Sequence, residues 1–129
     1  MPVVRVSLLR GKSPEYLKAV STAIYDAMVA SYDLVPNDLF QIIHQHEPGE
    51  LIYDLTYGGG PRSESFMLIS IIGGKERSIA KKQAFFKHLV AKLEADAKVR
   101  PEDVFIMLDN ATPSDFSFGS GLSIVPLES

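Results

Sequence analysis

The second residue of the chain, Pro2, is the first candidate for chemistry. A small residue at this position permits removal of the initiator Met1, which would leave proline with a free secondary amine. An α-amine titrates at about 7.7–8.0, and burial disfavours its cation. Such an amine can act as a general base, or as a general acid if it is held charged. A proline that merely follows the start codon is the alternative, and the dipeptide alone does not decide between them.

Two further segments carry residue types that suit a binding site. Lys75-Glu76-Arg77 follows an apolar run and places two cations where an anionic substrate can be bound, although solvated surface charges would look the same. The segment 115–121 (DFSFGSG) interleaves Phe116 and Phe118 with small residues. This pattern is typical either of a pocket wall or of ordinary core packing.

Metal and nucleotide chemistry have no comparable signal. His44 and His46 alternate on a predicted strand and share a face, but no third ligand lies at a spacing that completes a metal site. The glycine-rich phosphate-binding motifs GxxxxGK and GxGxxG are absent, and with no cysteine the chain has no thiolate. We therefore expect an activity that uses neither a metal nor an organic cofactor.

Composition describes one ordinary globular domain spanning 1–129. The 129 residues are 46% hydrophobic and 22% charged, and the formal net charge of −3 offers no basic surface for nucleic acid. No apolar run approaches the ~20 residues of a membrane helix, and residues 1–20 lack a signal-peptide core. Because the absence of cysteine suits a reducing compartment, we expect a cytoplasmic protein that binds neither membranes nor nucleic acid.

The chain also contains an internal repeat. The segment VPNDLF at 35–40 matches RPEDVF at 100–105, which pairs Asp38 with Asp103 at an offset of 65 residues. The same offset pairs Ser13 with Ser78, and it aligns apolar positions of the predicted strands and helices. We interpret the chain as two copies of one unit, joined by a glycine-rich and proline-rich loop and followed by a tail: about 2–46 and 66–109.

Each copy has the pattern strand, helix, strand. The helices are expected to begin at Ser13-Pro14 and after Ser78, since serine is a preferred N-cap and proline is favoured at the first helical position. The fold class is therefore α/β: β-α-β-β-α-β, a four-stranded mixed sheet with two helices on one face. The other face would be apolar, and association with further copies would cover it. The predicted strands, including one possible short strand in the linking loop, are 3–9, 39–45, 51–55, 66–72 and 104–108.

These residues together resemble the tautomerase superfamily and, within it, the malonate semialdehyde decarboxylase family. The likeness extends from Pro2 through VPNDLFQIIH to DFSFGSG. Pro2 matches the catalytic proline of the family, and Asp38 matches its catalytic aspartate. Arg77 matches one of two substrate-binding arginines, while Lys75 stands where the family has the other. Phe116 replaces a tryptophan that is usual in the tail motif.

The resemblance implies a homotrimeric enzyme acting on a small oxo acid or its enol. Pro2 would move the proton or polarise the carbonyl, and Asp38 would orient water or tune Pro2. Arg77, helped by Lys75, would bind the carboxylate from a strand end outside the core, and the phenylalanines would form the pocket wall. Keto–enol tautomerisation, decarboxylation and hydration all stay open. So does a non-catalytic trimeric binding or signalling protein that retains the fold.

Overall fold

The computed structural model describes residues 2–126, which form four strands, two long helices and two short 3-10 turns. Each 3-10 turn begins with a proline, and the first leads directly into β4. The elements are β1 (Val3–Leu9), α1 (Pro14–Ser31), β2 (Gln41–His46), β3 (Met67–Gly73), α2 (Ile79–Ala97), η1 (Pro101–Asp103), β4 (Val104–Asn110) and η2 (Pro113–Asp115).

Both helices begin where the sequence predicts. The Ser13 side chain accepts a hydrogen bond from the Tyr16 N–H, and Pro14 occupies the first turn of α1. Ser78 caps α2 in the same way, accepting from the Lys81 N–H. Each serine supplies an acceptor to one of the backbone donors that the first turn of a helix leaves unpaired.

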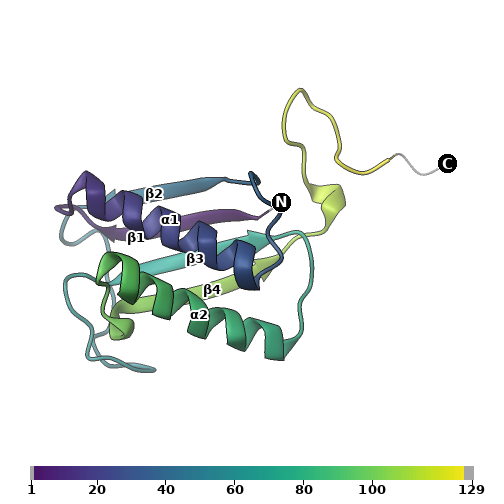
Figure 1. Ribbon diagram of the computed structural model, residues 1–129. Coiled ribbons are helices and arrows are strands. Elements are labelled where there is room, and N and C mark those ends of the chain that lie inside the picture. The colour runs from purple at the N-terminus through teal and green to yellow at the C-terminus, as the bar shows by residue number, and fades with distance from the viewer. Residues whose placement is uncertain (1, 127–129) are drawn as a thin grey trace.

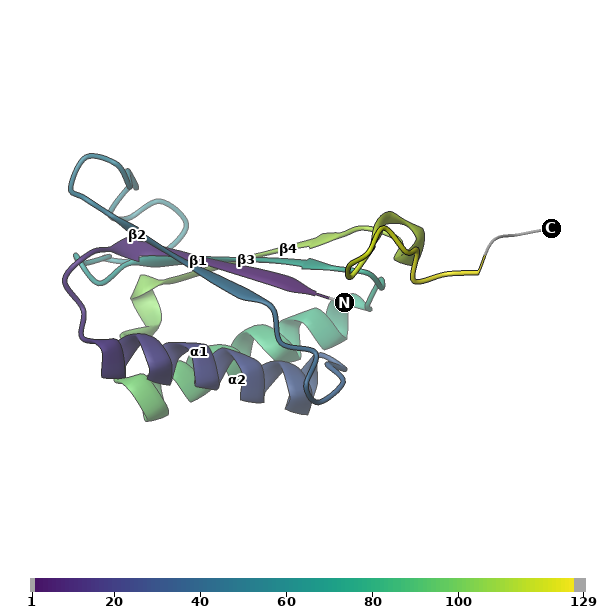
Figure 2. The same cartoon turned by 90° about the horizontal axis from the view of Figure 1, so that it is seen from above.

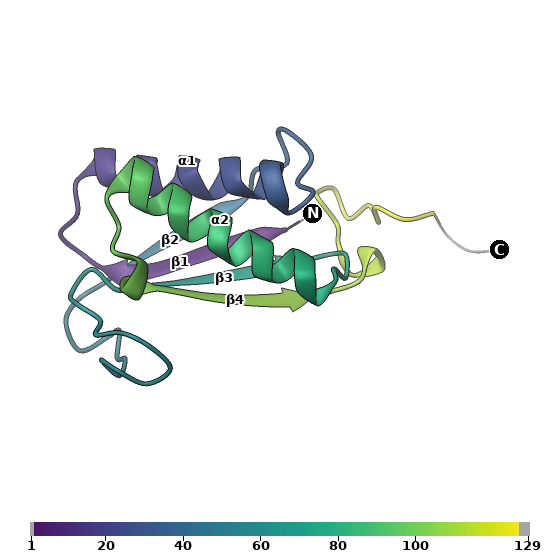
Figure 3. The same cartoon turned by 60° about the horizontal axis from the view of Figure 1, so that its bottom comes forward.

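The sheet has the strand order β2-β1-β3-β4 (Figure 3). β1 runs parallel to β2, β3 runs parallel to β4, and the two central strands are antiparallel. This confirms the predicted mixed sheet. Because of these directions, the first residues of β1 and β2 and the last residues of β3 and β4 lie at the same end of the sheet, which we call the Pro2 end.

Both helices pack on one face of the sheet, and within residues 2–126 the other face carries no helix (Figure 2). The core lies between the layers and includes inward-facing strand residues and the buried stripe of each helix, such as Val6, Ile69, Ile24 and Leu89. The open face carries four exposed apolar side chains: Ile42, Ile72, Phe105 and Met107. A sheet with one bare, partly apolar face is as predicted.

The loop between the two units is irregular throughout its described length, so the short strand expected at 51–55 is wrong. Asp54 explains the difference, because its carboxylate accepts the N–H groups of Thr56 and Tyr57 and turns the chain. Those hydrogen bonds also hold the pKa of Asp54 below its usual value. The tail after β4 leaves the body near the chain start (Figure 1). Within residues 2–126, neither helix has the length and apolarity to cross a membrane.

Candidate active site

Pro2 is buried at the start of β1, and it lines a small hollow at the Pro2 end that is too narrow to hold a water molecule. Asp38 lines the same hollow, so the fold brings together two residues that are 36 positions apart in the sequence. Phe40, at the end of the repeated motif, and Gln41, just after it, also line the hollow, although sequence reasoning did not single them out. The lining residues are Pro2, Val4, Met28, Leu34, Asp38, Leu39, Phe40 and Gln41.

Asp38 lies in a tight turn between α1 and β2. Its N–H donates to the Val35 carbonyl at 3.1 Å, and the next N–H, of Leu39, donates to the Asn37 carbonyl at 2.9 Å. Asn37 has a left-handed backbone (φ 76°), a conformation that asparagine tolerates better than most residues. The turn is therefore built by local chemistry already present in the VPND segment, and it presents Asp38 towards the start of β1.

Arg77 lies beside the hollow and does not line it. Its guanidinium stacks on the Tyr32 ring at 3.9 Å from the centroid, and donates to the carbonyls of Tyr32 and Lys75, each at 2.8 Å. The Arg77 side chain is only 6% exposed. The side chain lies outside the hydrophobic core, as expected, but it is largely buried, because it joins the end of α1 to the loop that follows β3.

Gly73, the last residue of β3, makes this approach of Arg77 possible. A Cβ atom at Gly73 would lie 3.3 Å from the Arg77 Nη1 atom, which is tighter than most packed contacts. Val3 pairs with Ile72 across the antiparallel ladder, so their neighbours Pro2 and Gly73 lie at the same end of the sheet. Arg77, in the loop after β3, and Pro2, just before β1, thus lie at the same end of the sheet.

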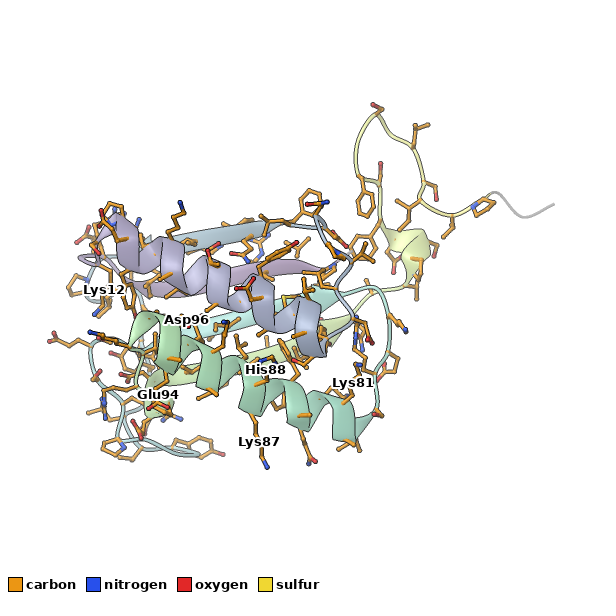
Figure 4. All side chains as sticks on the ribbon, in the orientation of Figure 1. Lys12, Lys81, Lys87, His88, Glu94 and Asp96 are labelled. Atoms are coloured by element: carbon orange, nitrogen blue, oxygen red, sulfur yellow. The ribbon has the colours of Figure 1, made fainter. Side chains whose placement is uncertain are left out.

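Charged side chains surround Arg77. Lys81, near the start of α2, donates to the Asp33 carboxylate at 2.9 Å, and this hydrogen bond holds the pKa of Asp33 below its usual value. Asp33 also lies 3.9 Å from the Arg77 Nε atom. Lys75 is exposed. Figure 4 shows Lys81 on the part of α2 that lies beside the end of α1. The Lys75 ammonium group is thus accessible to an anion from solvent.

The tail brings one of its two predicted wall residues to the site. Phe118 stacks on Phe40 with ring centroids 6.0 Å apart, and Phe40 lines the hollow. Phe116 is half-buried, and its backbone bonds to the tail itself, through Pro113 and Ile124. The structure therefore links Phe118, and not Phe116, to the wall of the hollow.

The opposite end of the sheet carries the repeat's counterpart of Asp38. Asp103 is fully buried, and its carboxylate accepts the Ser63 N–H at 2.7 Å and the Ser63 hydroxyl at 2.6 Å. Lys12, at this same end, donates to the Ser65 hydroxyl at 2.7 Å. Figure 4 shows Lys12 at the other end of the molecule from Lys81. The linking loop is thus anchored to the second end through Asp103.

The histidine pair lies on the open face, in strand β2. Arg5 has only N–H donors, so His44 Nε2 accepts its hydrogen bond at 3.2 Å, and the His44 and His46 rings stack with centroids 6.3 Å apart. In the part of the chain that is described, no group of three histidine, aspartate or glutamate side chains is arranged to hold a metal ion. The pair therefore belongs to the surface of the sheet.

The sequence is similar to a known protein family and to known proteins. Two family models described as "Tautomerase enzyme" match residues 38–119 and 2–54. The chain is 32% identical to the probable tautomerase YusQ of Bacillus subtilis (strain 168), over 94% of this chain and 95% of that protein.

Solved structures of related proteins are also similar to this chain. A malonate semialdehyde decarboxylase described with decarboxylase and hydratase activities is 32% identical, with a TM-score of 0.88 over 94% of this chain and 93% of that one. A second one, inhibited by 3-bromopropiolate, is also 32% identical, with a TM-score of 0.86 over 94% and 92%. A fused 4-OT trimer, 20% identical over 94% of both chains with a TM-score of 0.73, shares the fold. The chain belongs to the tautomerase family.

Proposed function

We propose that the chain is an enzyme that acts on a small oxo acid or its enol, with Pro2 as the acid–base group. The observation that carries this proposal is the shared hollow, which places Pro2 and Asp38 in one lining at the start of β1. The likeness to two malonate semialdehyde decarboxylases supports the same class of substrate. Removal of Met1 is a requirement, because an amide nitrogen at Pro2 would have no basicity.

The surroundings of Pro2 act on its amine in opposite directions. The apolar residues Val4, Met28 and Leu34 line the same hollow, and an apolar environment disfavours the cation. The Asp38 carboxylate favours the cation. A neutral amine would abstract a proton and catalyse keto–enol tautomerisation. A cationic amine would stabilise the enolate that develops when a β-oxo acid loses carbon dioxide.

Lys75 and Arg77 would bind the substrate carboxylate. A guanidinium carries five N–H donors, and two of those of Arg77 are already bound to backbone carbonyls. Its remaining donors can serve a carboxylate at the rim, while the exposed Lys75 provides a mobile charge. Arg77 would then have two functions, as a structural link between α1 and β3 and as part of the binding site.

We further propose that the chain assembles as a homotrimer. The open sheet face exposes Ile42, Ile72, Phe105 and Met107, and burial of such residues is the usual driving force for association. The fused 4-OT relatives of the same fold are trimers. Sedimentation of a monomer at micromolar concentration would refute this assembly.

Two measurements test the enzymatic proposal. Intact mass of the purified protein should show the loss of one methionine. Phenylenolpyruvate tautomerisation and malonate semialdehyde decarboxylation, assayed side by side, should then show turnover of at least one substrate. Retention of Met1, or no turnover of either substrate by the processed protein, would reject the proposal.

The second candidate is a non-catalytic trimeric binding or signalling protein. The observation that favours it is the engagement of Arg77, whose guanidinium is buried and already bonded to protein groups. This candidate predicts that Met1 can be retained without consequence and that neither substrate is turned over. The same mass and activity measurements therefore discriminate the two candidates.

A further inference from the structure

Helix α1 holds the segment that carries Asp38 at two points. At one, Tyr25 accepts the Asn37 N–H on its hydroxyl oxygen at 2.9 Å. At the other, the Gln41 side chain accepts the Ser21 hydroxyl at 2.6 Å and donates to the Ser21 carbonyl at 3.1 Å. Ser21 and Tyr25 are four residues apart, so both face the same side of the helix.

These two contacts bracket Asp38. Asn37 precedes it directly, and Gln41 follows three residues later at the start of β2 and lines the hollow. The Tyr25 ring packs against the core, so its hydroxyl has a fixed position from which to accept the Asn37 N–H. Asn37 itself is exposed, which means that water can replace the tyrosine oxygen if it is removed. Loss of the contact would therefore release the turn without leaving a buried donor unpaired.

We propose that Tyr25 is a positioning residue that sets the approach of Asp38 to Pro2. The proposal rests on the function proposed above, because it assumes a free amine at Pro2 that responds to Asp38. Among the described residues that line the hollow, Asp38 is the only one with a titratable side chain. Movement of its carboxylate therefore changes the charge that the Pro2 amine faces.

The test is the titration of the Pro2 nitrogen, followed by NMR of protein labelled with 15N-proline. In Tyr25→Phe the carboxylate is held less firmly, so the Pro2 cation is less stabilised and its titration midpoint falls. The contact is one ordinary hydrogen bond, which corresponds to a decrease of about 0.4–1 pH unit. For a β-oxo acid that is decarboxylated through the Pro2 cation, kcat should fall about three- to tenfold with KM unchanged.

Tyr53→Phe is the matched control. The Tyr53 hydroxyl also bonds to loop backbone, donating to the Ser63 carbonyl at 2.7 Å, but that loop lies at the opposite end of the sheet. The control should leave the Pro2 midpoint and kcat unchanged, even if it lowers the unfolding temperature as much as Tyr25→Phe does. An unchanged midpoint in Tyr25→Phe, or equal decreases in both variants, overturns the proposal.

Asp38→Asn separates this inference from the proposed function. If Tyr25 acts through Asp38, the double variant Tyr25→Phe/Asp38→Asn should have the midpoint and kcat of Asp38→Asn alone. A further decrease of either quantity in the double variant overturns the role of Tyr25 and leaves that of Asp38 standing. A retained Met1 removes the proposed function and the Tyr25 inference together, whereas a wild-type midpoint in Asp38→Asn overturns the Tyr25 inference alone.

Discussion

Replacement of Arg77 by alanine should lower both the stability and the activity of the protein. The substitution removes a buried guanidinium that links two parts of the Pro2 end. Its two backbone hydrogen bonds reach Tyr32 at the end of α1 and Lys75 in the loop after β3, and its plane covers the Tyr32 ring. In Arg77→Ala these two carbonyls lose their donors, and the aromatic face loses its cation.

The size of the stability loss follows from these contacts. A hydrogen bond from a charged donor contributes about 1.5–3 kcal/mol, and a partly desolvated cation–π contact about 0.5–2 kcal/mol. The desolvation of the guanidinium offsets part of this sum. We therefore expect Arg77→Ala to lower the free energy of unfolding by about 2–4 kcal/mol. Urea titration of both proteins at the same protein concentration compares this quantity, since the stability of an oligomer depends on protomer concentration.

Arg10→Ala provides the matched control. Arg10 occupies the comparable end of β1 and pairs with Glu47 at 3.0 Å, but its side chain is 56% exposed. An exposed pair of this kind contributes only about 0–1 kcal/mol. If the two variants unfold at the same urea concentration, Arg77 is an ordinary surface charge and the structural role assigned to it is wrong. If Arg77→Ala is destabilised while its kcat/KM stays within twofold of wild type, the role in carboxylate binding is wrong.

Three further substitutions test other parts of the proposal. Pro2→Ala in correctly processed protein should lower activity by about 10²–10⁴, and an unchanged steady-state rate would exclude Pro2 from the mechanism. Asp103→Ala should lower the free energy of unfolding by about 1–3 kcal/mol, because a loop N–H loses its buried acceptor. Asp38→Ala should lower it by less. A larger loss for Asp38→Ala in urea titration would contradict the structural role of Asp103. Met107→Lys should dissociate the trimer, as measured by sedimentation. Ile79→Lys should not, because Ile79 is exposed on the face that carries the helices. A trimer in both variants would place the interface elsewhere.

The parts of the fold that the sequence predicted well are those determined by local interactions. The helix starts follow from Ser13 and Ser78, whose caps depend only on residues three positions ahead. The strand pairing follows from the repeat, since two β-α-β units joined by a loop restrict the sheet to few topologies. The details that the sequence did not predict are contacts between residues far apart in the chain. The Arg77–Tyr32 contact joins residues 45 positions apart, and no local pattern indicates it.

Loop chemistry accounts for the one strand that was wrongly expected. The segment 51–55 (LIYDL) is a short, mostly apolar run bounded by glycine and proline, which is typical of a strand. Asp54 interrupts it, because its side chain binds the backbone donors that a neighbouring strand would have used. An aspartate followed two residues later by threonine and then by a glycine run was the signal that indicates a turn here.

The two ends of the sheet show why the repeated motif alone could not identify the site. At the offset of 65 residues, Asp38 corresponds to Asp103 and Pro2 corresponds to Met67, which is fully buried. The second unit is entered through the linking loop, whose Ser63 satisfies both oxygens of Asp103. The first unit is entered through Pro2, and there Asp38 and Pro2 share one lining. The aspartate therefore anchors the linking loop at one end, and at the other it lies in the lining where we propose that the chemistry takes place. The difference arises from the residues that lead into each strand.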